Sequence, residues 1–455
     1  MQRKRLSTTI KMAVALFVCL PVLLQSGTTY PKPDRTQETY KNLEVFSNVL
    51  SIIQQDYVEE INVQDVIEGA IKGMLNSLDP HSSFMKPEDF KELQVETKGS
   101  FSGIGIEITI KDGILTVVSP IEGTPAFKKG IKAGDLIIKI EGESTKDMSL
   151  MEAVKKLRGA KGTEVTISIH REGWSELKEI TMIRDVIPLH SVRNKTLEPG
   201  YGYVRITNFQ TKTTVDLRKA LEDLTAAGDT KGLVLDLRNN PGGLLDQAVK
   251  VTDLFIEEGV IVSTKGRLKD QNMEFTAHSR GMVFKQPLVV LVNGGSASAS
   301  EIVAGALQDH KRALILGTQT FGKGSVQTII PMNDGAGLRL TTARYYTPNG
   351  TSIQAKGITP DIIVPLQPAS NGDTDKKPPQ FLREKDLRHH LKNGDEKMEE
   401  NGADQKIDEN DTGDEEMDEG KEALEKDNQL QVALVILKSL NVFSGMEMTD
   451  QPQGQ

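Results

Sequence analysis

The sequence predicts a multidomain α/β protein. We expect a helical N-terminal region, a β-rich domain, an α/β core with a largely parallel sheet, a disordered acidic linker and a C-terminal helix. The 455 residues allow about three folded units at roughly 150 residues each. Hydrophobic residues make up 37% and charged residues 26%, which excludes collagen-like and wholly disordered proteins. Strand and helix patterns alternate after residue 200, and this alternation predicts the parallel sheet.

The N-terminus has the order of residues that a secretory signal requires. Four basic residues within the first eleven precede an apolar run from 12 to 24, and small or polar residues follow it. The run is shorter than the about 20 residues that span a bilayer. We expect residues 1–28 to be a signal peptide, with an uncleaved N-terminal anchor as the open alternative. The single cysteine, Cys19, lies in this run, so a processed chain would have no thiol for a disulfide or a metal.

Three folded regions follow. Apolar residues at intervals of three and four predict amphipathic helices within residues 34–97. Residues 98–184 change to short strands punctuated by glycine, with one helix. Residues 185–365 alternate nearly continuous apolar strands with helices, which is typical of a parallel sheet covered on both faces, with ligands at the carboxyl ends of its strands.

The C-terminal part is acidic. Between residues 395 and 422, 14 Asp and Glu face 3 Lys, so this stretch contributes −11 to the net charge of −9 and the rest carries about +2. No basic stripe with interleaved aromatic residues favours nucleic-acid binding. We expect residues 366–422 to be a disordered linker. Residues 423–445 form a helix whose apolar stripe must pack on the chain's own core or on another molecule, and we favour another copy or a partner.

The β-rich domain opens with a glycine turn. In Gly103-Ile104-Gly105-Ile106, backbone N–H groups can converge on a terminal carboxylate while the adjacent strand edge pairs with the ligand. The run Ala-Gly-Asp-Leu-Ile follows about thirty residues later. In this order of motifs, residues 98–184 resemble a PDZ domain, which implies that the four turn residues bind a C-terminal carboxylate. A dinucleotide site is disfavoured because the turn enters a strand and lacks a third glycine.

Familiar catalytic motifs are absent from the sequence. There is no H-E-x-x-H, no G-x-S-x-G and no P-loop, and the seven histidines have no metal-like spacing. We expect no metal and no cofactor. The remaining candidate is the run from Asn293 to Ile302, where a strand ends and a helix begins. Ser296, Ser298 and Ser300 all qualify as nucleophile here, and each also fits as a plain helix cap.

A second run supplies a base. Lys323 lies between Gly322 and Gly324, just after the next predicted strand. A lysine can deprotonate a serine if burial lowers its pKa from about 10.4 toward 7 to 8. Gln327 lies four residues on, and its amide oxygen can orient the ammonium without adding a charge that would stabilise the protonated amine.

These two runs, the PDZ-like domain before them and the segment 78–84 resemble the carboxyl-terminal processing protease family, also called tail-specific proteases, over about residues 40–365. The resemblance implies that Ser298 is the nucleophile, that Lys323 is the general base and that Gln327 positions the lysine.

The resemblance also implies further roles. Either Gly242 or Gly243, with the N–H of Ala299, is expected to form an oxyanion hole. Arg158 resembles a PDZ arginine that communicates ligand occupancy to the protease site, although an ordinary surface arginine is an equal alternative. Asp309 matches an acidic position proposed as a catalytic partner. We interpret it as structural, because eleven residues place it about 16 Å along the helix from the nucleophile.

We therefore expect an exported serine endopeptidase of the periplasm or cell envelope. It would capture C-terminal tails through its PDZ domain and cleave them with a Ser-Lys dyad assisted by Gln. The expected partners are proteins with accessible, apolar C-termini, an adaptor protein, and a second copy through the terminal helices. Membrane association through the N-terminal segment stays open. The alternative is a catalytically silent envelope scaffold that binds protein C-termini.

Overall fold

The computed structural model describes residues 35–447 with gaps at 112, 227, 279–282, 368–380 and 394–426. The chain divides into two compact units, residues 1–71 and residues 72–455. The expected signal peptide lies outside the described residues. Within the described part of the chain, no helix has the length and apolar character that a membrane span requires.

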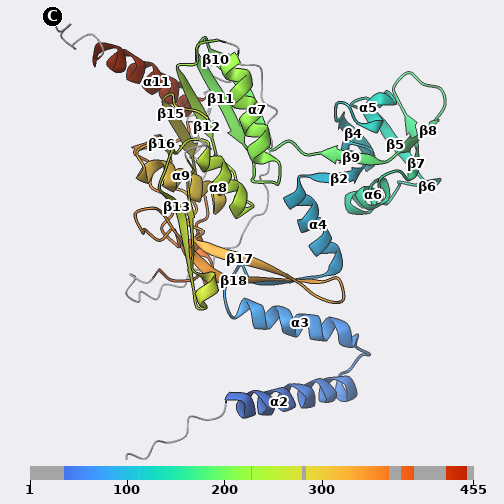
Figure 1. Ribbon diagram of the computed structural model, residues 1–455. Coiled ribbons are helices and arrows are strands. Elements are labelled where there is room, and N and C mark those ends of the chain that lie inside the picture. The colour runs from blue at the N-terminus through green and yellow to red at the C-terminus, as the bar shows by residue number, and fades with distance from the viewer. Residues whose placement is uncertain are drawn as a thin grey trace, which may run out of the picture. The chain divides into compact units, whose positions relative to one another are not determined.

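The helices follow the predicted regions (Figure 1). In chain order they are α2 (Arg35–Asp56), α3 (Val63–Asn76), α4 (Pro87–Lys98), α5 (Pro125–Lys128), α6 (Leu150–Leu157), α7 (Thr213–Ala226), α8 (Leu245–Asp253), α9 (Ala299–Asp309) and α11 (Asn428–Glu447), with the 3-10 turns η1 (Lys269–Gln271) and η2 (Glu384–Asp386). The predicted N-terminal helices are thus confirmed as α2 and α3.

The β-rich domain contains one antiparallel sheet and a short two-stranded ribbon. The sheet has the order β3-β4-β5-β7-β8, with β6 on β5, and the ribbon pairs β2 with β9. Their bounds are β2 (Ser100–Gly103), β3 (Ile106–Lys111), β4 (Ile114–Pro120), β5 (Leu136–Ile140), β6 (Glu143–Ser144), β7 (Glu164–His170), β8 (Lys178–Ile183) and β9 (Asp185–Pro188). Among the described strands, β3 pairs with β4 alone, so its other edge has no strand partner there, and α6 contacts β3.

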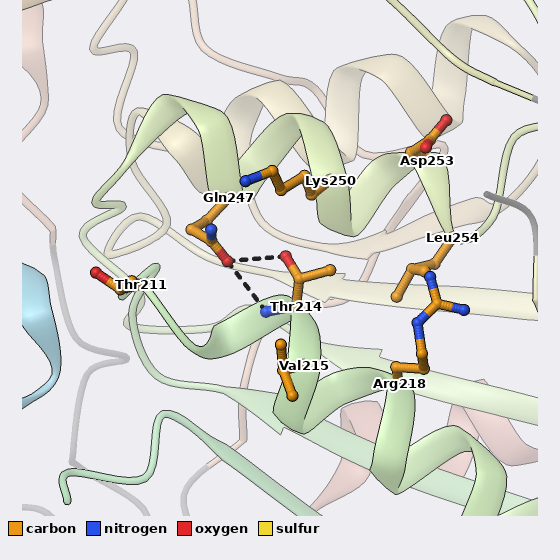
Figure 2. A pocket seen from close by; sticks show the side chains of 8 residues that line it. All are labelled: Thr211, Thr214, Val215, Arg218, Gln247, Lys250, Asp253 and Leu254. Atoms are coloured by element: carbon orange, nitrogen blue, oxygen red, sulfur yellow. Dashed lines mark hydrogen bonds between the residues drawn. The ribbon is translucent and has the colours of Figure 1, made fainter.

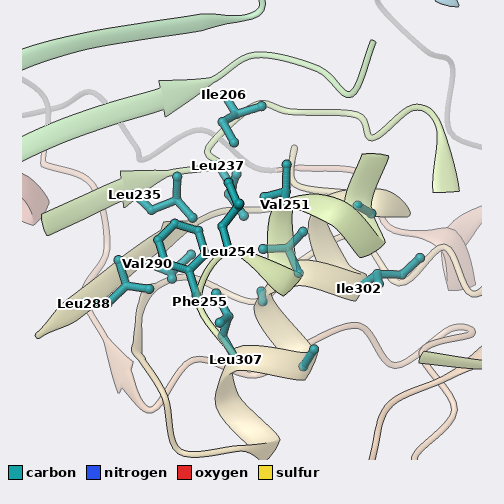
Figure 3. Packing of buried hydrophobic residues seen from close by; sticks show 14 of the residues in the cluster. Ile206, Leu235, Leu237, Val251, Leu254, Phe255, Leu288, Val290, Ile302 and Leu307 are labelled. Atoms are coloured by element: carbon teal, nitrogen blue, oxygen red, sulfur yellow. The ribbon is translucent and has the colours of Figure 1, made fainter. Parts of the chain in front are cut away.

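The core sheet has the order β10-β11-β12-β15-β16-β19 and is parallel from β11 onward. Its strands are β10 (Val192–Glu198), β11 (Tyr201–Ile206), β12 (Gly232–Asp236), β15 (Leu288–Val292), β16 (Leu314–Gly317) and β19 (Ile362–Ile363). Alternate side chains face opposite layers. Leu235 and Val290 pack with residues of α8 and α9 (Figure 3), whereas Val234 and Val289 pack with α11. The predicted α/β class with both faces covered is confirmed.

A second sheet is antiparallel. It has the order β1-β18-β13-β14, and β17 also pairs with β18. Its strands are β1 (Ser83–Met85), β13 (Val260–Gly266), β14 (Met273–Thr276), β17 (Ser325–Pro331) and β18 (Gly337–Tyr346). The strand β13, which the alternation had suggested for the parallel sheet, belongs here because it pairs with β14 and β18.

The C-terminal helix differs from our favoured interpretation. Leu430, Ala433, Leu434 and Leu437 are buried against the chain's own core sheet, so this stripe does not await another copy or a partner. The reason is that the alternating strands leave a second apolar face, which α11 covers.

The linker expectation is wrong for residues 381–393. Glu384 is fully buried and Asn393 is buried as well. Polar side chains attach residues 381–393 to the core, so the hydropathy pattern of this segment does not reveal that it is packed there. The rest of the linker, from 368 to 380 and from 394 to 422, lies outside the described residues.

Candidate active site

The turn between β15 and α9, residues 293–298, separates the three candidate serines. The hydroxyl groups of Ser296 and Ser300 are fully buried and donate to the carbonyl oxygens of Leu237 at 2.8 Å and Asn240 at 2.9 Å. The side chain of Ser298 makes no cap hydrogen bond with the helix that it precedes, and it is partly exposed. Two of the serines therefore build the turn, and Ser298 alone is available for chemistry.

Ser298 also has an unusual backbone. Its φ of 53° and ψ of −110° lie outside the regions that L-residues prefer. Such a conformation costs about 1–3 kcal/mol and persists only where the surrounding structure enforces it. This conformation lets the chain turn sharply between the end of β15 and the N-terminus of α9, where the first N–H groups of the helix face the turn.

The glycine turn after β12 lies against Ser298. A Cβ atom on Gly242 would lie 2.9 Å from the Cβ of Ser298 and 3.0 Å from the backbone N of Ala299. The N–H of Gly242 already donates to Oδ1 of Asn240 at 2.9 Å. Within the described chain, no hydrogen bond uses the N–H of Gly243 or that of Ala299. The structure thus places Gly242 against Ser298, with Gly243 next in the chain against Phe209, and the N–H groups of the two glycines differ in availability.

The lysine loop, residues 318–324, joins the two sheets. The N–H of Phe321 donates to the carbonyl oxygen of Ser296 at 3.1 Å, which attaches the loop to the serine turn. A Cβ on Gly324 would lie 2.2 Å from the backbone N of Gln354, so only glycine allows this approach.

Glu301 connects the two predicted catalytic segments, and sequence reasoning assigned it no role. Its Oε2 accepts from the backbone N–H of Ser298 at 2.8 Å and from that of Lys323 at 2.9 Å. Its Oε1 accepts from the N–H of Gly322 at 2.7 Å and from the hydroxyl of Thr320 at 2.6 Å. The signal for this residue was the Ser-x-x-Glu spacing of a capping box.

Burial decides the charge state of this carboxyl. Glu301 is fully buried, and burial raises its pKa to about 7 although the four donors lower it. One carboxylate oxygen therefore fixes the backbone of the serine relative to that of the lysine, at a group that gains a proton near neutral pH.

The amine of Lys323 lies among charged groups. Burial lowers its pKa, and the charge of Arg339 lowers it further. Glu384, Glu301 and Asp79 act in the opposite direction, because their negative charges favour the protonated amine. The net direction is downward, as a lysine acting as a base requires.

Gln327 lies on β17 beside the lysine loop. Its Nε2 donates to the hydroxyl oxygens of Ser325 at 3.2 Å and Thr341 at 2.8 Å. Its Oε1 is buried and has no partner within the described chain. A buried acceptor without a partner is costly, so this oxygen is the one polar atom of Gln327 that stays free to accept a hydrogen bond. No hydrogen bond joins Oγ of Ser298 to Nζ of Lys323 in the described structure, and such contacts often form only with bound substrate.

Asp309 lies at the last position of α9, away from the serine turn. Its Oδ2 accepts from the N–H of Asn349 at 2.9 Å, which gives it a structural contact.

The PDZ-like turn has free donors. Ile104 is buried, and Gly105 has a φ of 77°. The N–H groups of both donate to no described residue. Arg158, at the end of α6, forms two hydrogen bonds with the carboxylate of Glu92 at 2.7 and 2.8 Å and lies over the ring of Phe101.

A pocket of about 360 Å³ lies elsewhere, between α7 and α8. Figure 2 shows its lining, in which the N–H and hydroxyl of Thr214 both donate to Oε1 of Gln247. None of the predicted site residues lines it. In the described residues, no group of three His, Cys, Asp or Glu is arranged to hold a metal ion.

Family models match the three regions in order. Residues 23–89 match the activating protease CtpB N-terminal domain, residues 92–170 match the PDZ domain and residues 200–364 match peptidase family S41.

Whole relatives agree with these matches. A carboxy-terminal-processing protease of Bartonella bacilliformis is 49% identical over 384 residues, which cover 83% of this chain and 86% of that protein. Carboxy-terminal processing protease CtpA of Bacillus subtilis is 40% identical over 315 residues, or 69% of this chain and 67% of that protein. Among solved structures, the photosystem II D1 C-terminal processing protease is 33% identical, with a TM-score of 0.41. The match covers 70% of this chain and 92% of that one. The chain belongs to the carboxy-terminal-processing proteases of peptidase family S41 and is a serine-type peptidase with a PDZ domain.

Proposed function

We propose that this peptidase is exported and cleaves proteins near their C-termini with Ser298 as nucleophile, Lys323 as general base and Gln327 as the residue that orients the amine. The observation that carries the proposal is the position of Glu301. One of its oxygens accepts from the backbone N–H of Ser298 and from that of Lys323, which fixes the two residues relative to each other.

The chemistry follows from the charge states. Neutral Lys323 takes the proton of the Ser298 hydroxyl while the oxygen attacks the scissile carbonyl carbon. The ammonium that forms donates to the unpartnered Oε1 of Gln327 and then gives its proton to the leaving amine. Water, deprotonated by the same amine, hydrolyses the acyl-enzyme and restores Ser298.

The oxyanion needs donors that are not already used. We assign the N–H of Ala299, at the helix N-terminus, and the N–H of Gly243 to this role. Gly242 serves differently, because its N–H donates to Asn240 and its missing side chain leaves room beside Ser298.

Tail capture uses the PDZ domain. A C-terminal segment adds as a strand to the open edge of β3, and its carboxylate binds the N–H groups of Ile104 and Gly105. Gly103 and Ile106 flank these donors and complete the turn. The open strand edge and the unused N–H groups support this assignment.

The remaining proposals concern location and partners. The basic and apolar order of the first 24 residues supports export to the periplasm or cell envelope. The exposed apolar side chains of α2, including Leu43, Phe46 and Val49, support association through the N-terminal helices. We propose protein substrates with apolar C-termini; an adaptor stays a prediction.

The test compares one peptide in two forms. Purified protein is incubated with an apolar-tailed peptide that ends in a free carboxylate or in an amide. We expect cleavage of the free acid at least about 10-fold faster, because the amide removes the charge that the turn binds. A serine-reactive acylating probe is applied in parallel to the wild type and to Ser298→Ala.

Labelling of the wild type and none of the Ser298→Ala variant supports the nucleophile. Equal cleavage of the two peptides would remove carboxylate capture. Labelling that persists in Ser298→Ala would reject Ser298.

A further inference from the structure

The segment Phe381–Asn393, here called the strap, lies against both catalytic segments. A Cβ on Gly294, in the serine turn, would lie 2.3 Å from the Cβ of Phe381, so the backbone of that turn contacts the strap directly. The N–H of Glu384 donates to the carbonyl oxygen of Phe321 in the lysine loop at 3.1 Å. The strap therefore touches the turn that carries the serine and the loop that carries the lysine.

Glu384 is fully buried, and both of its carboxylate oxygens are used. Oε1 accepts from Nε2 of Gln354 at 2.8 Å, and Oε2 lies 2.7 Å from Nε2 of His81. Oε1 of Gln354 in turn accepts from the N–H of Gly324, the neighbour of the catalytic lysine, at 3.0 Å. Asn393, at the far end of the strap, donates to the carbonyl oxygen of Gln354 at 3.0 Å.

The segment that carries His81 is also connected to Gln327. Asp79 accepts from the N–H of His81 and from the hydroxyl of Ser82, both at 2.8 Å. The hydroxyl of Ser82 accepts from the N–H of Thr341 at 3.1 Å, and the hydroxyl of Thr341 accepts from Gln327. One turn of the N-terminal region is thus connected by hydrogen bonds to Gln327 and, through Glu384, to Gly324.

We propose that the strap completes the catalytic site and that Glu384 is a positioning residue, which holds the lysine loop through Gln354 and is itself held by His81. This inference rests on the proposed function, because it assigns Glu384 a role in placing Lys323. A buried carboxylate is tolerated here because each of its oxygens has a partner. Removing one partner would leave a buried charge unpaired, which destabilises this part of the structure.

Charge supports the same assignment. Four charged groups act on the amine of Lys323: Arg339 from β18, Glu301 from α9, Asp79 from the N-terminal turn and Glu384 from the strap. Replacing Glu384 by glutamine removes one negative charge that favours the ammonium. The pKa of Lys323 then falls further, so the rising limb of the kcat/KM profile moves to lower pH.

The variants separate hydrogen bonding from charge. Glu384→Gln keeps both contacts, since its oxygen accepts from Gln354 and its amide donates to His81. Glu384→Ala and His81→Ala break the connection. Lys385→Ala is the matched control, because Lys385 is the next residue of the strap and is exposed.

Activity is measured on the free-acid peptide, and probe acylation of Ser298 is timed. We expect Glu384→Ala to lose about 100-fold in kcat with KM within about 2-fold, since a displaced catalytic group costs about that much. His81→Ala loses in the same direction, and the double variant loses no more than Glu384→Ala alone. Glu384→Gln keeps most of kcat and shifts the pH limb toward acid. Lys385→Ala matches the wild type.

Amide hydrogen exchange at residues 318–324 gives a readout that does not depend on turnover. Exchange there should rise at least about 10-fold in Glu384→Ala. If Glu384→Ala does not fold, the double variant Glu384→Gln with His81→Ala takes its place, with the same expected rise. An unchanged exchange rate, or a Glu384→Gln profile superimposable on the wild type, overturns the role of Glu384. If neither the wild type nor Lys385→Ala cleaves the peptide, the proposed function is overturned. Hydrogen exchange at residues 318–324 then still tests whether Glu384 holds the lysine loop.

Discussion

The protease site and the PDZ turn use backbone N–H groups in opposite ways. In the protease site, the N–H groups of Ser298, Gly322 and Lys323 converge on a carboxylate that the chain itself supplies, Glu301. In the PDZ turn, the corresponding donors meet no carboxylate of the described chain. Converging N–H groups therefore fix two segments relative to each other where the chain supplies the anion, and under the proposed function they form a binding site where the substrate supplies it.

The largest expected effect tests the chemical side of this comparison. Lys323→Met keeps the length of the side chain and removes the base. We expect kcat to fall about 10⁴-fold, at the upper end of general acid-base contributions, with the thermal midpoint retained because the apolar replacement suits a buried site. Steady-state kinetics and thermal unfolding measure both. Turnover close to that of the wild type would show that another group deprotonates the serine.

Glu301→Gln tests the internal anion. An amide can accept at only one of its two ends, so two of the four donors lose their partner and the serine and lysine shift relative to each other. We expect a loss of about 10²-fold in kcat with little change in KM.

The pH dependence of stability adds a second readout for Glu301. Its pKa is raised from 4.5 to about 7 in the folded state. The folded state thus binds this proton more tightly than the unfolded state, so the stability that Glu301 contributes is complete below pH 4.5 and is lost as the pH rises through about 7. Urea unfolding of the wild type and of Glu301→Gln at several pH values should show this loss in the wild type alone. Parallel curves would contradict it.

Gln327→Glu adds a charge beside the lysine. A carboxylate there favours the ammonium, so the pKa of Lys323 rises and the rising limb of kcat/KM moves to higher pH. The shift is opposite to that expected for Glu384→Gln, and the two profiles are best recorded together. A limb that does not move would place Gln327 too far from the amine to orient it.

Gly105→Ala tests the external anion. A Cβ there would lie 2.4 Å from the Cβ of Thr124, and the φ of 77° disfavours alanine as well. We expect KM for the free-acid peptide to rise about 10-fold with kcat unchanged, because binding and not chemistry is affected. Gly113→Ala is the matched control, since it has the same φ and nothing within 4 Å of the added Cβ. Equal effects of the two variants would mean that backbone strain alone is responsible.

Arg158→Ala gives the smallest expected effect. Arg158 and Glu92 are partly exposed, and exposed ion pairs contribute about 0.2–1 kcal/mol. We expect a double-mutant cycle with Glu92→Ala to give a coupling in that range, and at most about a 3-fold change in cleavage of the free-acid peptide. A change of 10-fold or more in kcat would instead support the regulatory role that the resemblance implies for Arg158.

Local patterns predicted the parallel sheet, and they singled out two segments that the structure brings together through Glu301. Apolar periodicity placed the strands and helices, except that it assigned β13 to the parallel sheet. Periodicity failed for the strap, because polar contacts to residues far away in the sequence hold it. The favoured interpretation of the C-terminal helix, packing on another copy or a partner, was wrong as well, because a stripe of leucines does not say which apolar surface it meets.

By itself, then, the sequence determined which residue types are available for chemistry and where each strand gives way to a helix, since both depend on neighbours a few positions apart. Only the tertiary structure decided which serine is free, that Glu301 joins Ser298 to Lys323, and that Glu384 reaches Gly324 through Gln354. These depend on burial and on hydrogen bonds between distant segments. Whether a hydroxyl is used or a carboxyl is charged follows from what surrounds it in space, and that surrounding is made only when the chain has folded.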